Sequence, residues 1–257
     1  MTAAFQFFLM LLCLVDTTMA SDQQRELDYA AAIEKNTPKA QVVWLEAEQK
    51  RFLALFSETE RTANTQAAII LHGQGEHPDI SPLIHGLRLE LPQHQWATLA
   101  IQLPVLERGA PVADYFSLFE QAQERILSAV KFLQEKGANS IVLIGYDYGA
   151  AMAAFTLNNQ PKGISGWVAL SLPVPDSPLP QAQIGQFMQK IALPLLDIYA
   201  EFDLPEVLQT ARQRRLSAKD NPGYRQIQID GEDHRYENDP ALLIKRVYSG
   251  LSYMLNH

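Results

Sequence analysis

Cysteine is almost absent from this chain, whose 257 residues contain a single one, Cys13. Because no cysteine follows Cys13, the rest of the chain cannot contain a disulfide framework, a zinc–thiolate site or a cysteine nucleophile. Internal repeats, low-complexity tracts and long linkers rich in Pro, Gly or Ser are missing too, so no boundary divides the sequence. What is present is an ordinary globular composition, 47% hydrophobic and 19% charged, sufficient for one large core or at most two small ones.

Long hydrophobic runs are also lacking, apart from one near the N-terminus at residues 5–15. This run is too short to cross a bilayer as a helix, which takes about 20 apolar residues. Small residues at Thr18 and Ala20 follow it, as at a signal-peptidase site, and residues 22–35 are then markedly polar. We therefore expect residues 1–20 to be a signal peptide that is removed.

The absence of Lys and Arg before the apolar run favours the alternative, a buried N-terminal helix. A lipoprotein is not expected, because Leu11 and Leu12 stand before Cys13, where a lipid-attachment motif has a small residue. With the signal peptide removed, the mature protein is expected to be exported to the periplasm without a membrane span. Residues 21–40 then form a polar N-terminal segment ahead of a single domain at 41–257.

Acidic and basic residues are interspersed along the chain and do not form blocks of one charge. Acidic residues outnumber basic ones and give a formal net charge of -8. Nucleic acid and anionic membranes are therefore not expected as partners. A small-molecule substrate or ligand is expected instead, and the sequence does not indicate an oligomeric state.

Strand and helix patterns alternate through most of the chain. Residues 67–71 form a continuous apolar run, as in strands buried on both faces. Residues 114–135 keep one face apolar at helical spacing, and Gly137 ends that helix. The other expected strands are 41–45, 51–56, 96–102, 140–144, one within 163–172, 193–199 and 224–229, and the other helices are 81–91, 148–158, 204–216 and 240–255. One antiparallel hairpin followed by six strand–helix units predicts a mostly parallel central sheet with helices on both faces.

The pentapeptide Gly145-Tyr146-Asp147-Tyr148-Gly149 stands directly between an expected strand and an expected helix. G-x-X-x-G at such a junction is the pattern of a nucleophile elbow, in which glycines permit a tight turn and the middle residue projects above the sheet. The middle residue here is Asp147. Alternatively, its carboxylate only caps the following helix, whose free N–H groups and dipole favour an anion.

A second motif, His72-Gly73-Gln74-Gly75, follows the first buried strand and is called the oxyanion loop below. In folds with an elbow, the loop after this strand supplies one backbone N–H of an oxyanion hole, and the residue after the nucleophile supplies the other. Those residues are Gln74 and Tyr148. Taken alone, the motif is equally compatible with a glycine-rich turn of no chemical consequence.

Asp203 follows the penultimate expected strand, and His234 follows the last one. An acid and a histidine at these places support the nucleophile of a catalytic triad, in the chain order nucleophile, acid, histidine. Asp197 and Asp233 are rival carboxylates, but Asp197 lies inside an apolar strand and Asp233 adjoins the histidine and points elsewhere. A surface histidine without a role is the alternative for His234.

With these motifs in this order, the chain resembles the α/β-hydrolase superfamily over residues 41–257. The stretches LHGQGEHPD, WATLAIQLP, LIGYDYGAAMA, LDIYAEFDLPEV and IDGEDHRY look, more narrowly, like a bacterial family of exported α/β-hydrolase-like proteins of unknown function. The resemblance implies the α/β-hydrolase fold with a short lid, a triad-like set of Asp147, Asp203 and His234, and no cofactor.

An aspartate at the elbow changes the expected chemistry, because a carboxylate is already ionised at neutral pH and has no hydroxyl to activate. One interpretation is a hydrolase in which Asp147 is itself the nucleophile, as in haloalkane dehalogenases and epoxide hydrolases. His234, oriented by Asp203, then activates water against the alkyl ester. The other interpretation is a catalytically inactive binding or assembly protein of the cell envelope.

Two features bear on the choice between an enzyme and an inactive protein, and they favour opposite answers. The Asp203–His234 pair favours an enzyme. Against it, dehalogenases and epoxide hydrolases carry a helical cap with Tyr or Trp donors for the leaving group, whereas residues 173–192 are short, rich in proline and free of both. The sequence therefore indicates a hydrolase with unknown substrate and leaves the inactive alternative open.

Four residues of metal-ligand type, His72, Glu76, His77 and Asp79, lie close together in the sequence. Spacing alone does not give the convergent geometry that an oxygen–nitrogen site needs. No metal is therefore expected.

Overall fold

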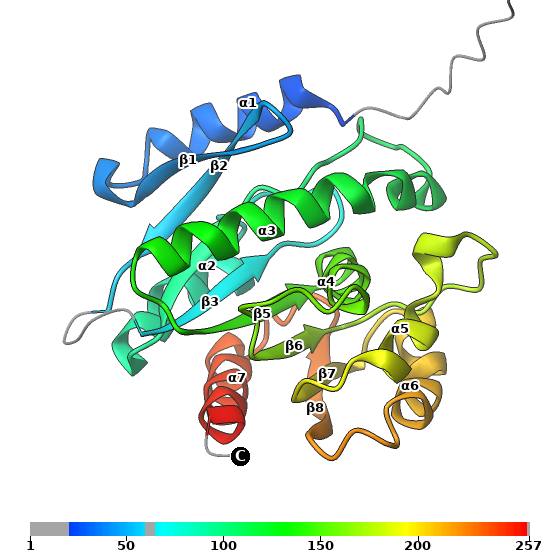
Figure 1. Ribbon diagram of the computed structural model, residues 1–257. Coiled ribbons are helices and arrows are strands. Elements are labelled where there is room, and N and C mark those ends of the chain that lie inside the picture. Colours follow the sequence, from blue (N-terminus) through cyan, green and yellow to red (C-terminus); the bar gives the residue numbers. More distant parts are fainter. Residues whose placement is uncertain (1–20, 60–64, 256–257) are drawn as a thin grey trace, which may run out of the picture.

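The computed structural model describes residues 21–59 and 65–255 of the chain. The signal peptide expected at residues 1–20 lies outside these described residues. The centre of the fold is an eight-stranded sheet with the order β1-β2-β4-β3-β5-β6-β7-β8 (Figure 1). Within the described ranges, no helix is both long and apolar enough to cross a membrane.

The strand directions follow the predicted order. The strands are β1 (Val42–Ala47), β2 (Lys50–Ser57), β3 (Gln66–Leu71), β4 (Ala97–Ile101), β5 (Ser140–Tyr146), β6 (Gly166–Leu170), β7 (Leu195–Phe202) and β8 (Tyr224–Asp233). The pairs β1–β2 and β2–β4 are antiparallel, whereas β3–β4, β3–β5, β5–β6, β6–β7 and β7–β8 are parallel. The sheet is thus mostly parallel with an antiparallel N-terminal hairpin, which confirms the prediction.

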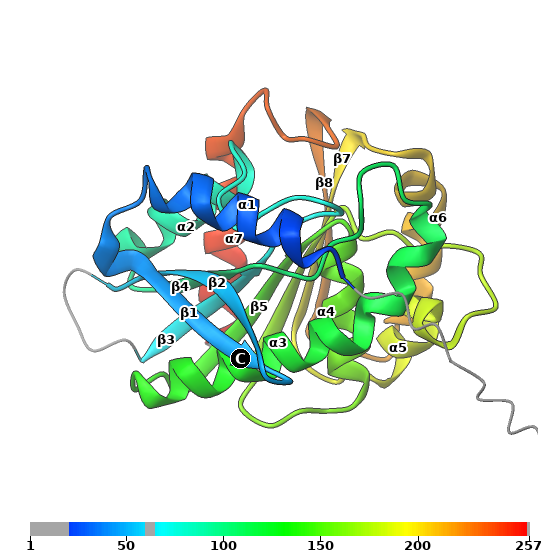
Figure 2. The same cartoon turned by 90° about the horizontal axis from the view of Figure 1, so that it is seen from above.

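Helices cover both faces of this sheet. They are α1 (Gln23–Glu34), α2 (Leu83–Glu90), α3 (Phe119–Glu135), α4 (Tyr148–Asn158), α5 (Ile184–Lys190), α6 (Pro205–Ser217) and α7 (Pro240–Leu255), with short 3₁₀ helices at Lys39–Gln41, Leu91–His94, Val112–Leu118 and Pro180–Ala182. Seen from above, α1, α2 and α7 lie on one side of the sheet, and α3, α4, α5 and α6 lie on the other (Figure 2). This is the α/β-hydrolase architecture.

Alternate strand residues supply an apolar core on each face. In β3, Ile69 packs with residues of α3 and α4, whereas its neighbour Ile70 packs with residues of α2 and α7. Both side chains are fully buried, as expected of a central parallel strand covered on both sides. Burying each isoleucine contributes about 1.5–3 kcal/mol. The sheet is therefore a rigid platform for the loops that leave the carboxyl ends of its strands.

The helix α1 is an addition to the expected elements. Its segment was expected only to be polar, and its buried apolar residues are limited to Ala30 and Ile33. A buried ion pair between Glu26 and Arg125 of α3, 2.9 Å between the charged atoms, holds the helix on the domain. Because this contact joins distant parts of the chain, apolar periodicity could not indicate it.

Two further differences concern helix bounds and the lid. The helix expected from residue 114 begins at Phe119, because residues Val112–Leu118 form a 3₁₀ helix. Residues 173–192, which were expected to form a short lid, contain α5, which follows a proline-rich stretch that hides its brief helical pattern.

Candidate active site

Asp147 occupies the sharp turn between β5 and α4. Its φ is 52° and its ψ is -125°, a sparsely populated conformation that costs about 1–3 kcal/mol and is found mainly at functional sites. The flanking glycines make room for the turn. A Cβ on Gly145 would lie 2.5 Å from the Cα of Ala150, and one on Gly149 would overlap the carbonyl oxygen of His72. The turn therefore has the geometry of a nucleophile elbow.

The carboxylate of Asp147 does not cap α4, since its side chain makes no capping hydrogen bond. It reaches the oxyanion loop instead, where the backbone N–H of Gln74 donates to its Oδ2 at 3.0 Å. The backbone N–H of Tyr148 acts to lower the pKa of the same carboxylate. Of the two N–H groups expected of an oxyanion hole, that of Gln74 thus donates a hydrogen bond to the side chain of Asp147.

The surroundings of Asp147 control its charge. Burial raises the pKa of Asp147 above its ordinary value, while the Gln74 N–H and the positive charge that His234 can carry act in the opposite direction. The net raised pKa indicates a carboxylate that is largely kept from water. Such a group needs to lose little hydration before it attacks a carbon atom.

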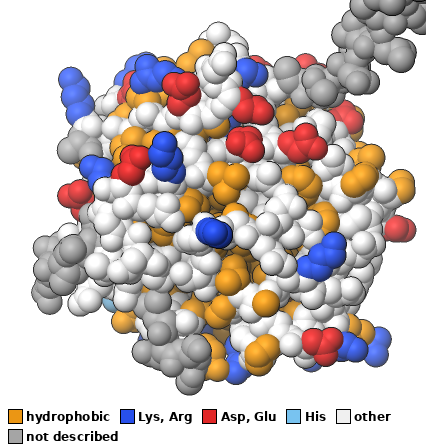
Figure 3. All heavy atoms as spheres, in the orientation of Figure 1, with side chains coloured by type: hydrophobic (Ala, Val, Ile, Leu, Met, Phe, Trp, Pro, Cys, Tyr) orange, Lys and Arg blue, Asp and Glu red, His pale blue; other side chains and the backbone are white. Residues whose placement is uncertain are grey.

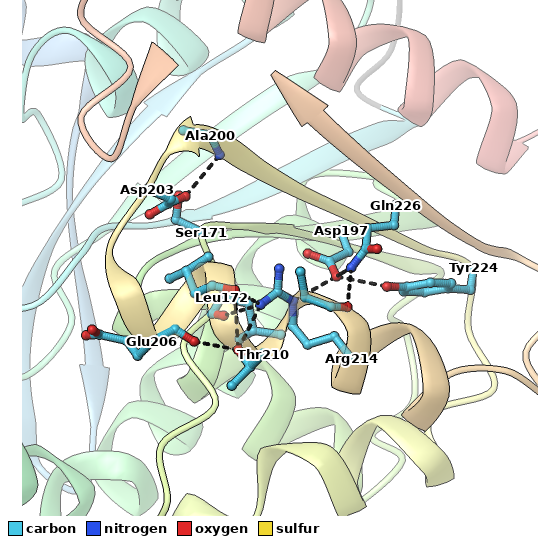
Figure 4. Close-up of polar contacts among 12 residues, drawn as sticks. Ser171, Leu172, Asp197, Ala200, Asp203, Glu206, Thr210, Arg214, Tyr224 and Gln226 are labelled. Atoms are coloured by element: carbon cyan, nitrogen blue, oxygen red, sulfur yellow. Dashed lines mark hydrogen bonds and ion pairs between the residues drawn. The ribbon is translucent and has the colours of Figure 1, made fainter. Parts of the chain in front are cut away.

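Asp203 lies just after β7 and holds the imidazole of His234, with 2.7 Å between Oδ1 and Nδ1. Its Oδ2 accepts hydrogen bonds from the Ser171 hydroxyl at 2.5 Å and from the Ala200 N–H at 3.0 Å (Figure 4). Although burial acts to raise the pKa of Asp203, the hydrogen bonds from His234 and Ser171 hold it below its ordinary value. Asp203 is therefore a fixed anion, as an orienting acid must be.

His234 directly follows β8. Burial acts to lower its pKa, but the hydrogen bond to Asp203 and the charges of Asp147 and Glu76 raise it overall. Because Nδ1 is bound to Asp203, Nε2 is the nitrogen that can exchange a proton with water or substrate. The Tyr146 ring packs beside the imidazole, with 5.2 Å between centroids, and the Tyr146 hydroxyl donates to the His234 carbonyl at 3.0 Å. The position of the His234 imidazole is thus fixed by Asp203 and by Tyr146.

His72 braces the oxyanion loop. Its Nδ1 donates to the Gly73 carbonyl at 2.9 Å, and its Nε2 accepts the Leu103 N–H at 2.9 Å. This pattern requires the neutral imidazole, and burial lowers the pKa of His72 to about 3. The loop after β3 is thereby tied to the loop after β4 without a charge.

The helix α1 holds the same loop from outside. Arg25 Nη2 donates to the Gly75 carbonyl at 2.6 Å, and the Tyr29 hydroxyl donates to that oxygen at 2.8 Å. Arg25 Nη1 also donates to the Leu106 carbonyl at 2.5 Å. Gly75 has a φ of 69°, where a side chain is disfavoured. These contacts fix the backbone immediately after Gln74, and they could not be predicted because α1 itself was not expected.

Replacing Arg25 with alanine is expected to loosen the oxyanion loop. Hydrogen bonds from a charged donor are worth about 1.5–3 kcal/mol, so the free energy of unfolding should fall by about that amount. The Gln74 amide should also exchange faster with deuterium. Chemical denaturation and hydrogen-exchange mass spectrometry measure the two effects. Arg108→Ala, at an exposed position beyond the same β4 loop, is the matched control, and equal protection of Gln74 in both variants would argue against this bracing.

The rival carboxylates lie elsewhere. Asp197 of β7 is fully buried and pairs with Arg214 of α6 at 2.8 Å, apart from Asp203 (Figure 4). Asp233 is exposed, and its Oδ1 accepts the N–H of Arg235 at 2.9 Å. Asp203 is therefore the carboxylate that the fold places on the imidazole.

Ser171 and Tyr236 belong to the site although the sequence did not single them out. The Ser171 hydroxyl, after β6, donates to Asp203 and lies 2.8 Å from the Tyr236 hydroxyl oxygen. Both residues have positive φ values, 50° and 55°, which are uncommon outside glycine. Their one sequence signal is position, since Ser171 ends a strand pattern and Tyr236 closely follows the histidine motif.

The four residues of metal-ligand type do not converge. His72 is bound within its loop, His77 packs on an aromatic ring of α1, and Asp79 pairs with an arginine of α2. Glu76 is the member that lies in the site, where its Oε2 accepts the Gly73 N–H at 3.0 Å. In the part of the chain that the structure describes, no group of three or more His, Cys, Asp or Glu is arranged to hold a metal ion.

Solved structures with the same architecture cover most of this chain. Est1E from Butyrivibrio proteoclasticus has a TM-score of 0.70 at 14% identity and covers 84% of this chain and 100% of that chain. An esterase from Pyrococcus furiosus has a TM-score of 0.68 at 17% identity, with 84% and 95% covered. A dienelactone hydrolase from Anabaena variabilis has a TM-score of 0.66 at 16% identity, with 82% and 96% covered. These likenesses establish the α/β-hydrolase fold, and no curated protein matches the sequence.

One protein-family model matches the chain in two overlapping segments, residues 16–119 and 116–249. Together the segments contain the oxyanion loop, the elbow, Asp203 and His234. The description of the family is a protein of unknown function, which agrees with the narrower resemblance seen in the sequence. The chain therefore belongs to the DUF3530 family, which is described as a protein of unknown function.

Proposed function

We propose that this protein is a hydrolase that uses Asp147 as a carboxylate nucleophile on a small electrophilic substrate. The hydrogen bond from the Gln74 N–H to Asp147 Oδ2 carries the proposal. It leaves Oδ1 as the oxygen that attacks, and it places a donor where negative charge develops when the resulting ester is hydrolysed. The fold that the chain shares with esterases and other hydrolases supports a hydrolytic reaction.

The reaction has two steps. In the first, Asp147 Oδ1 bonds to an electrophilic carbon and displaces the leaving group with its electron pair, which gives an alkyl ester. In the second, His234 Nε2 takes a proton from water, and the hydroxide adds to the carboxyl carbon of the ester. The N–H groups of Gln74 and Tyr148 stabilise the oxyanion, which then expels the alcohol oxygen as His234 returns the proton to it.

Buried aromatic rings adjoin the elbow, which agrees with a small and largely apolar substrate. The ring of Tyr148 packs against those of Tyr115 and Phe116, with centroids 6.2 and 5.8 Å away. On the face of the described residues that Figure 3 shows, acidic and basic side chains are interspersed among apolar ones, with no continuous basic patch. This face therefore has no concentration of positive charge for a polyanionic partner.

We also propose that the protein is exported to the periplasm by the signal peptide at residues 1–20, which N-terminal sequencing of the mature protein tests.

The His234→Ala variant is expected to trap the ester on Asp147. Loss of the general base should slow ester hydrolysis by at least about 10²-fold, so a single adduct should accumulate in the variant and stay transient in the wild type. Intact-mass spectrometry and peptide mapping after incubation with propylene oxide or propyl iodide detect it. His94→Ala, at an exposed position outside the site, should behave as wild type. If no protein carries an adduct on Asp147, the inactive binding protein becomes the better explanation.

A further inference from the structure

Glu76 places a second carboxyl group beside Asp147. The N–H groups of Gly73 and Gln74 are consecutive, and each donates to a carboxylate. Gly73 donates to Glu76 Oε2 at 3.0 Å, and Gln74 donates to Asp147 Oδ2 at 3.0 Å. Two carboxyl groups held by adjacent N–H groups repel each other when both are ionised. One of them therefore tends to hold a proton near neutral pH.

The backbone surroundings of the two carboxyl groups differ. Two backbone N–H groups, those of Gln74 and Tyr148, act against the rise in the pKa of Asp147 that burial causes. Glu76 has a single backbone donor, Gly73, and no described residue donates a hydrogen bond to its Oε1. Backbone N–H groups therefore favour the ionised form at two points on Asp147 and at one on Glu76, and a difference of this kind separates a nucleophile from an acid.

Glu76 also borders open space. It lines a cavity of about 220 Å³ together with Tyr146 and Arg235, which stand next to Asp147 and His234 in the chain, although neither Asp147 nor His234 lines that cavity. Burial and the charge of Asp147 raise the pKa of Glu76 to about 7, although the Gly73 N–H, His234 and Arg235 act against this rise. The titratable and charged groups around Glu76 are Tyr146 of β5, Asp147 of the elbow, and His234, Arg235 and Glu237 after β8.

We propose that Glu76 is a catalytic acid that protonates the leaving oxygen when Asp147 attacks, so that epoxides and not alkyl halides are the substrate class. This inference rests on the proposed function, because it needs Asp147 as the nucleophile. An alkoxide leaves poorly without a proton, whereas a halide needs none. The lid at residues 173–192 brings no Tyr or Trp to the leaving group. Glu76 supplies the donor that this lid lacks.

Protons and bonds balance over the cycle. Asp147 Oδ1 bonds to an epoxide carbon, the carbon–oxygen bond breaks with its electron pair on oxygen, and the Glu76 proton transfers to that oxygen. The products are a hydroxyalkyl ester and a Glu76 carboxylate. Hydrolysis with His234 then releases a diol and leaves Asp147 as a carboxylic acid, whose proton returns to Glu76. One epoxide and one water give one diol, and no other reactant is needed.

Ester formation on Asp147 in the His234→Ala background tests this role, with propylene oxide and propyl iodide as probes. Adding Glu76→Gln should slow the epoxide ester by at least about 10²-fold, the usual contribution of a general acid. The iodide ester should form at an unchanged rate. Glu76→Asp, which keeps an acid, should restore part of the epoxide rate, and Glu237→Gln, on the same cavity, should change neither. Peptide mapping gives the rates, and thermal unfolding verifies that each variant is folded.

The pH dependence provides a second readout. Because Glu76 must be protonated, the epoxide rate should fall as pH rises through the pKa of Glu76, and Glu76→Gln should remove this fall. That pKa is about 7 with His234 present and is higher in the His234→Ala background, because the positive charge of His234 lowers it. The iodide rate should show no such fall.

Three outcomes would overturn the inference, and they differ in what they leave standing. Equal epoxide labelling with and without Glu76→Gln removes Glu76 as the acid but leaves the proposed function. Equal loss of both esters in a folded Glu76→Gln protein assigns Glu76 to holding the oxyanion loop in place. Absence of both esters in the His234→Ala protein itself overturns the proposed function and this inference with it.

Discussion

Substituting Asp147 with asparagine should abolish ester formation and reduce turnover by at least about 10³-fold. The amide has nearly the same size and fits the turn, but it has no charged oxygen to attack a carbon atom. The thermal stability of Asp147→Asn should not decrease, although its activity does. Since the pKa of Asp147 is raised in the folded protein, its ionised form destabilises the fold at neutral pH, and the asparagine variant should unfold at an equal or higher temperature.

Asp233→Asn is the matched control for this prediction. Asp233 is exposed and adjoins His234 in sequence, but its side chain accepts the backbone N–H of Arg235. Its substitution should leave ester formation and turnover unchanged. Unchanged turnover in Asp147→Asn would remove Asp147 as the nucleophile, whatever the reaction proves to be.

Breaking the ion pair of Asp197 and Arg214 should destabilise the fold by about 3–5 kcal/mol. Both side chains have no exposure to solvent, and 2.8 Å separates Oδ2 from Nε. The same oxygen accepts hydrogen bonds from the Tyr224 hydroxyl and the Gln226 amide, both at 2.9 Å (Figure 4). Asp197→Ala therefore leaves a buried guanidinium without its counter-charge. Urea denaturation measures the loss.

The double variant Asp197→Leu with Arg214→Met separates charge from packing. Replacing a whole buried pair by apolar residues of similar size is often close to neutral, so this protein should recover most of the stability that Asp197→Ala loses. A loss below about 1 kcal/mol in Asp197→Ala, as is usual for exposed pairs, would mean that the pair is open to water. Because it joins β7 to α6, the pair also supports the loop that carries Asp203.

The fold could be predicted because its determinants are local in the sequence. The apolar run at residues 67–71 and the glycines of the elbow report directly on a buried strand and a tight turn. The placement of Asp203 and His234 after the last two strands could be predicted for the same reason. In a parallel sheet, the carboxyl ends of neighbouring strands meet at one edge.

The contacts that complete the site could not be predicted, because they join distant segments. Arg25 and Gly75 are 50 positions apart, and Ser171 and Asp203 are 32 apart. The sequence around Glu76 does not show whether this residue is a metal ligand in a loop or a carboxyl group next to Asp147. That distinction depends on the hydrogen bond to the Gly73 N–H and on the charge of Asp147.

The most direct test of a carboxylate nucleophile is to follow solvent oxygen. During turnover of propylene oxide in water enriched in oxygen-18, hydroxide adds to the carboxyl carbon of Asp147, so the label should enter the Asp147 side chain before it appears in the diol. Digestion and mass spectrometry of the peptide that contains Asp147 measure this incorporation. Label in that peptide is the expected result. Labelled diol with an unlabelled Asp147 would show that water attacks the substrate directly and would contradict the covalent mechanism.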